Sequence, residues 1–128
     1  MRIRASKRML VLALAVALGT VGCASGGGGG TARPEGASSN RIVRAELEPL
    51  GQISALRAVE RLRPSWLRSR SGDTPVLYVD GSRRGNTNDL AGMMATEVER
   101  MEFMSASDAT NRYGTGHAGG AILVQTLR

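Results

Sequence analysis

The sequence predicts an α+β domain: a small mixed β-sheet with one main helix and a short second helix. Apolar residues recur at helical spacing over residues 52–62, whereas residues 75–79, 100–104 and 121–124 are short apolar runs typical of strands. The helix follows an entering strand as a crossover would, and a glycine-rich loop joins the last two strands. We therefore expect both parallel and antiparallel pairing within residues 41–128.

The first 22 residues have the three parts of a secretory signal peptide. Residues 1–8 are basic, and residues 9–18 form an apolar run too short to span a bilayer. The third part is the segment of mostly small residues at positions 19–22, and the single cysteine, Cys23, follows it directly. The segment Val21-Gly22-Cys23 resembles a bacterial lipobox, although Thr20 stands where leucine is usual. The resemblance implies transfer of a lipid to the Cys23 thiol, cleavage before Cys23 and acylation of the new amine.

Residues 23–40 are predicted to be a lipid-anchored tether. They include five consecutive glycines and no large apolar residue, so burial cannot repay the entropy of ordering them. Two or three acyl chains anchor a protein stably where one does not. Ala24 follows the cysteine in place of an aspartate, so an inner-membrane retention signal is absent. We expect an outer-membrane lipoprotein whose domain faces the periplasm.

The charge of the chain gives little support to nucleic-acid binding. The formal net charge is +6, but Arg2, Arg4, Lys7 and Arg8 all lie in the predicted signal peptide. From Cys23 onward there are 13 arginines and 11 acidic residues, a net of +2 without any block of like charge. We expect no nucleic-acid partner and a monomeric chain.

The first half of the domain contains the main helix. Weak alternation over residues 41–47 predicts an entering strand, which Pro49 and Gly51 end. One face of helix 52–62 is apolar and the other is charged, and a proline at position 64 stops the helix. Trp66 is open to two interpretations, a ligand platform or a core residue. We favour the core because Trp66 directly flanks the helix end.

The second half is predicted to be mostly strand and loop. The strand over residues 75–79 ends in an Asp80-Gly81 turn, and residues 81–88 are predicted to be a loop. Asn88 or Asp89 is a candidate cap for a short helix over residues 90–94. Gly114 and Gly120 bracket the return between the last two strands. We expect Gly81, Gly114 and Gly120 to be structural turn residues.

Three segments near the C-terminus resemble the end of the plug domain of TonB-dependent outer-membrane receptors. These segments read R-M-E-F-M, A-T-N-R-Y-G and G-G-A-I-L-V-Q-T, and the earlier P-V-L-Y-V-D-G is also close to plug wording. The matching residues are Met101, Glu102, Phe103, Tyr113, Gly114, Gly120, Ile122, Val124 and Thr126. The chain departs from the family at Met93-Met94, where plugs often have Ile-Pro, and at Ala106, where they often have glycine.

The resemblance implies a plug-like fold and two alternative functions. The alternating segments of a barrel are not found in residues 41–128, so we expect a stand-alone plug-like module. The first function is a binding or interaction module that recognises a ligand or an envelope protein. The alternative is an accessory subunit that docks with a separately encoded outer-membrane transporter barrel.

Catalytic and metal-binding patterns are weak. His117 is the single histidine, and the sequence signals no nucleophile for it, so we expect a residue of an exposed loop rather than a base. The glycine pattern at positions 114, 116 and 119 is followed by a predicted strand, whereas a dinucleotide fingerprint needs a helix there. Asp80, Asp89 and Asp108 are spaced too irregularly for a calcium loop. We expect no enzyme activity, cofactor or metal.

The candidate residues for ligand or partner contact lie in two predicted loops. The first loop carries Arg83 and Arg84 between glycines, where they are able to grip an anionic group or to remain solvated. The second loop contains Arg112, Tyr113 and His117. We expect these five side chains to contribute to any binding site.

Overall fold

The computed structural model describes residues 32–68 and 71–128, which form one α+β unit. The strands are β1 (Arg41–Val43), β2 (Val76–Val79), β3 (Ser82–Asn86), β4 (Val98–Met104) and β5 (Ala121–Thr126). The α-helices are α1 (Arg44–Leu47), α2 (Ala55–Leu62) and α3 (Ala106–Tyr113). The 3₁₀ helices are η1 (Glu48–Leu50), η2 (Pro64–Leu67), η3 (Thr87–Gly92) and η4 (Ala95–Glu97). The predicted signal peptide, Cys23 and tether residues 24–31 lie outside the described residues.

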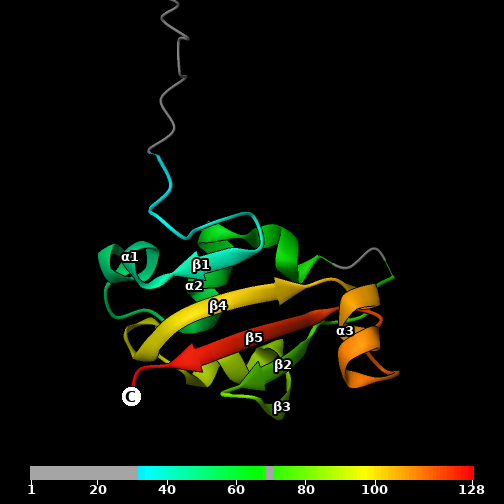
Figure 1. Cartoon of the computed structure of the whole chain (residues 1–128). Helices are drawn as coiled ribbons and strands as arrows, with labels where there is room; N and C mark the ends of the chain where they lie inside the picture. The colour runs from blue at the N-terminus through cyan, green and yellow to red at the C-terminus, as the bar shows by residue number, and fades with distance from the viewer. Residues whose placement is uncertain (1–31, 69–70) are drawn as a thin grey trace, which may run out of the picture. The chain divides into compact units, whose positions relative to one another are not determined.

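The five strands form one mixed sheet in the order β1-β4-β5-β2-β3. Strands β2 and β5 are parallel, and the other three neighbouring pairs are antiparallel. Figure 1 shows α2 behind the sheet and α3 beside the end of β4 and the start of β5. The predicted mixed sheet is confirmed. The last two strands pair with each other as expected, although α3 as well as the glycine loop lies between them.

The main core lies between α2 and one face of the sheet. Ser54 caps α2, since its side chain accepts a hydrogen bond from the backbone N–H of Arg57. The buried side of α2 packs against alternate residues of the central strands, and the cluster includes Val59, Leu77, Met101, Ile122 and Val124. Burial of each such side chain contributes about 1.5–3 kcal/mol. Helix α2 therefore covers this face of the sheet.

Trp66 belongs to the same core. Only 3% of its surface is exposed, and its ring stacks on that of Phe103 with 5.9 Å between the centroids. The indole N–H donates to the backbone carbonyl of Ser39 at 2.9 Å. The core interpretation of Trp66 is confirmed.

The opposite face of the sheet is only partly covered. Ala109 of α3 packs there with Val76, Tyr78 and Ala121, at one end of the central strands. Farther along this face the side chains of Arg100 and Gln125 are exposed. We call this side of the sheet, beyond α3, the open face.

The ordered part of the chain begins before residue 41. Ser38 and Arg41 exchange two backbone hydrogen bonds of 3.0 and 3.2 Å, and the Phe103 N–H donates to the carbonyl of Asn40 at 2.9 Å. These backbone contacts fix residues 38–40, which composition assigned to the tether, to the edge of the sheet. The composition of residues 38–40 does not indicate this order, because the bonds join backbone groups and involve no large apolar side chain.

A buried ion pair strengthens this attachment. The Nη2 atom of Arg63 lies 2.8 and 3.1 Å from the two carboxylate oxygens of Glu46. The guanidinium also donates to the carbonyls of Ser38, Arg41 and Leu62. Both side chains are more than 90% buried. Arg63 thus joins the end of α2 to α1 and to the start of the folded part.

The structure corrects three predicted elements and adds a helix. The entering strand stops at Val43, where α1 begins. The loop predicted over residues 81–88 contains β3, whose residues Ser-Arg-Arg-Gly-Asn pair with β2 without an apolar pattern. The short helix expected over residues 90–94 is η3, which Asn86 caps. Helix α3 was not predicted, because Ala109 is its one buried residue and its apolar signal is therefore weak.

Candidate functional site

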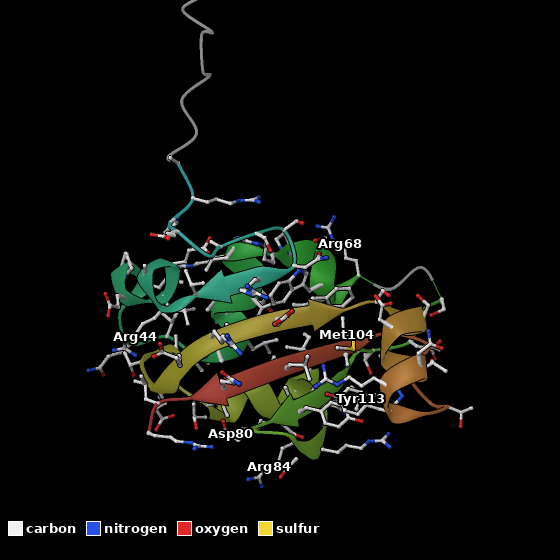
Figure 2. The ribbon with its side chains drawn as sticks, viewed as in Figure 1. Arg44, Arg68, Asp80, Arg84, Met104 and Tyr113 are labelled. Atoms are coloured by element: carbon white, nitrogen blue, oxygen red, sulfur yellow. The ribbon has the colours of Figure 1, made fainter. Side chains whose placement is uncertain are left out.

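Three of the five predicted contact residues converge around Tyr78 of β2. The Tyr78 and Tyr113 rings stack with 4.3 Å between centroids, and the His117 ring lies 5.9 Å from that of Tyr78. The guanidinium carbon of Arg112 lies 5.4 Å from the centroid of the Tyr113 ring, within the range of a cation–π contact. Figure 2 shows Met104 and Tyr113 where α3 meets the sheet. The end of α3 and the loop after it therefore build one aromatic cluster.

His117 is buried, so the prediction of an exposed loop residue is wrong. Its relative exposure is 1%. Nδ1 lies 2.8 Å from the carbonyl oxygen of Gly114, and Nε2 lies 2.9 Å from the hydroxyl of Tyr78. Because a carbonyl only accepts, Nδ1 carries the proton, and Nε2 accepts from the Tyr78 hydroxyl. The loop folds back onto β2, so His117 supports the aromatic cluster and is inaccessible to a ligand.

The predicted glycine turns have the expected backbone geometry. Gly81, Gly114 and Gly120 have φ values of +82°, +89° and +83°, a region that favours glycine. At Gly120 space is also restricted, since a Cβ atom there would lie 2.5 Å from the carbonyl oxygen of Met104. Gly114 ends α3, and its N–H donates to the carbonyl of Thr110 at 2.8 Å. The structural assignment of these glycines is confirmed.

A hollow of about 180 Å³ lies on the open face beside the aromatic cluster. Arg112 and Tyr113 line it from α3, and Arg100 and Glu102 line it from β4. The two β4 residues were not predicted as site residues. Their signal was present, however, because Arg100 and Glu102 alternate with the core-facing Met101 and Phe103 along one strand.

The chain does not bring Arg83 and Arg84 into this hollow. Both are exposed residues of β3, the edge strand. Arg83 lies opposite Tyr78 in the β2–β3 pair, at the edge of the open face. Arg84 lines a different hollow with Leu77 and Asp89, on the side of the sheet that faces α2. The two predicted contact arginines therefore lie on opposite sides of the sheet.

Asp80 connects the ends of β2 and β5 at the far end of the sheet from α3 (Figure 2). Its Oδ1 accepts from the Thr126 N–H at 3.0 Å, and its Oδ2 accepts from the Thr126 hydroxyl at 2.6 Å. The hydroxyl, followed by the backbone N–H, lowers the pKa of the Asp80 carboxyl. Asp80 also has φ +48°, a left-handed conformation that aspartate tolerates in turns.

No family model matches the chain, and no curated protein or solved structure is significantly similar to it. The described ranges contain no group of three or more histidine, cysteine, aspartate or glutamate side chains placed to hold a metal ion. None of the helices in residues 32–68 and 71–128 is long and apolar enough to cross a membrane. The hollow on the open face is lined by both charged and aromatic side chains, among them Arg100, Arg112 and Tyr113.

Proposed function

We propose that this chain is a non-catalytic outer-membrane lipoprotein whose plug-like domain acts as an interaction module. The observation that carries the proposal is the open face. One side of the sheet is covered by α2, whereas the other carries the exposed Arg100 and Gln125 around a hollow. Interfaces are rich in tyrosine and arginine, and Tyr113 and Arg112 line that hollow. A protein of the cell envelope is the proposed partner.

The rigidity of this face supports a binding role. β4 and β5 are central strands, paired on both sides, so the backbone under the open face has little freedom to move. The Tyr78–Tyr113 stack and the buried His117 hold the end of α3 against β2. A surface held in advance in one conformation loses less entropy on binding than a mobile loop does.

Anchoring through Cys23 is the second part of the proposal. It rests on the Val21-Gly22-Cys23 segment at the end of an apolar run. The intact mass of the protein from cells is expected to show cleavage before Cys23 and added acyl chains. Cys23→Ser is expected to leave the membrane fraction. An unmodified wild-type mass, together with unchanged fractionation of the variant, would exclude this anchor.

Co-purification from detergent-solubilised outer membranes tests the interaction. The matched variants are Gln125→Trp on the open face and Gln52→Trp in the loop before α2, since both glutamines are exposed. The bulky ring of Gln125→Trp is expected to obstruct the face and to deplete a co-purifying envelope protein that Gln52→Trp retains. Identification of that protein as a transporter barrel would favour the accessory-subunit alternative. Equal recovery with both variants would count against the open face.

A further inference from the structure

The hollow on the open face carries an excess of positive charge. Arg100 enters it from β4 and Arg112 from α3, and neither forms an ion pair within residues 32–68 and 71–128. Glu102 is the one acidic residue that lines it, and its carboxylate is 3.3 Å from the guanidinium of Arg41. The acidic side chain at the hollow thus already has a partner outside it. Two arginines remain for an anionic group.

The second feature of the hollow is the contact between the exposed Arg112 and an aromatic ring. Its guanidinium lies over the Tyr113 ring, and that ring is stacked on the buried Tyr78. Contact with an aromatic face restricts the orientation of a long side chain. An arginine held in this way loses less conformational freedom when it forms a two-bonded contact with a carboxylate. Arg112 is therefore better prepared for an anion than a freely solvated arginine.

The volume of the hollow limits the size of the group that can bind in it. Its volume of about 180 Å³ is below the range of roughly 300–1,000 Å³ that is usual for small-molecule pockets. A single side chain fits this space, and the open sheet around it leaves room for the rest of a protein surface. The exposed Gln125 at its rim supplies an amide that can bond to a partner's backbone or side chain.

We infer that the hollow receives one acidic side chain, an aspartate or glutamate, of the protein partner. In this arrangement Arg112 and Arg100 donate to the carboxylate, and the Tyr113 ring contacts the apolar part of the inserted side chain. The inference rests on the proposed function, because it names the chemistry by which the open face holds its partner. No bond is made or broken in the process.

Titration with the α-amide of N-acetyl-L-glutamate, whose one carboxylate is that of the side chain, tests this inference without the partner. The full chain, purified from cells in a nonionic detergent and labelled with ¹⁵N, allows the arginine Nε–H signals to be followed by NMR. Two of these signals are expected to shift and to saturate in the millimolar range, and Arg100→Gln and Arg112→Gln identify them. Each of these variants is expected to weaken binding about tenfold. Arg84→Gln, on the other side of the sheet, is the matched control and is expected to leave binding unchanged.

The α-amide of N-acetyl-L-glutamine, which carries no charge, and inorganic phosphate complete the experiment. The inference predicts no saturable shift with the uncharged amide, and weaker binding of phosphate than of the carboxylate. Equal shifts with the glutamine compound, tighter binding of phosphate, or unchanged binding by Arg112→Gln would each overturn it. Failure here leaves the co-purification test intact, because a partner that inserts no acidic side chain would still distinguish Gln125→Trp from Gln52→Trp.

Discussion

The Tyr78 hydroxyl and the His117 ring form a buried hydrogen bond of 2.9 Å that joins β2 to the loop between α3 and β5. The same imidazole is bound through Nδ1 to the carbonyl of Gly114, at the end of α3. A single side chain therefore fixes a strand, a helix end and a glycine loop. This arrangement sets the position of Tyr113 and, through it, of one wall of the hollow on the open face.

Loss of this side chain is expected to destabilise the protein. His117→Ala leaves the Tyr78 hydroxyl unpaired and creates a cavity beside the two tyrosine rings, at a cost of about 2–3 kcal/mol. Tyr78→Phe is expected to cost about 1 kcal/mol, because it removes one hydrogen bond and keeps the ring stack. Urea denaturation measures both values. A His117→Ala protein as stable as the wild type would show that the loop does not depend on this bond.

Substitution of Gly120 is expected to be more harmful than substitution of Gly114. Both residues have positive φ, which costs a side chain on the order of 1–3 kcal/mol. At Gly120 the new Cβ would also meet the carbonyl oxygen of Met104, whereas nothing lies within 4 Å at Gly114. The melting temperature should therefore fall in the order Gly114→Ala, Gly120→Ala, Gly120→Val.

Gly92→Ala is the control for this series. Gly92 has no positive φ, and its added Cβ meets no atom within 4 Å. We expect a melting temperature close to that of the wild type. Similar losses at Gly92 and Gly120 would mean that the series does not measure the strain and close contact at Gly120.

Removal of the charge on Glu46 is expected to destabilise the start of the folded part. Glu46→Gln leaves the buried guanidinium of Arg63 without its carboxylate, and breaking such a pair typically costs about 3–5 kcal/mol. Hydrogen exchange should then show lost protection at the N–H groups of Ser38 and Arg41. Glu48→Gln is the control, because the Arg44–Glu48 pair is exposed. Equal effects of the two variants would contradict the buried-pair account.

Stability is expected to fall at acid pH through Asp80. The pKa of this carboxyl is lowered in the folded state, so the ionised form stabilises the fold above the unfolded pKa of about 3.9. That contribution is lost as the pH falls from there through the lower folded pKa. Thr126→Val removes the hydroxyl that is the largest cause of the lowered Asp80 pKa, so the loss of stability at acid pH should be smaller in this variant. Thr126→Ser keeps a hydroxyl and should lose stability at acid pH as the wild type does. Unfolding curves between pH 2 and pH 7, with steps of about half a unit, decide between these outcomes.

Periodicity predicted the elements that have a strong apolar pattern. Helix α2, strands β2, β4 and β5, and the core position of Trp66 all follow from side chains that the fold buries. Periodicity missed β3 because this strand is held by backbone pairing with β2. It missed α3 because this helix is stabilised at its start by the Ser105 hydroxyl, which accepts from the Asp108 N–H, and has little apolar surface to bury. Neither element buries more than one apolar residue.

The candidate site was predicted in part for the same reason. Arg112 and Tyr113 were predicted from the sequence of this segment, and the structure places both at the hollow. The burial of His117 depends on Tyr78, 39 residues earlier in the chain, so a reading of the loop alone could not detect it. Arg100 and Glu102 belong to the site because Arg112 and Tyr113 of α3 line the same hollow. Strand alternation alone does not predict which polar face of a sheet stays uncovered.

Site-specific photo-crosslinking in living cells tests the central proposal most directly. A photoreactive residue is placed at Gln125 on the open face or, as the matched control, at Gln52 before α2. The interaction-module account predicts that position 125 crosslinks to one envelope protein and that position 52 does not. Equal crosslinking at both positions, crosslinking at position 52 alone, or none at either position would contradict the account.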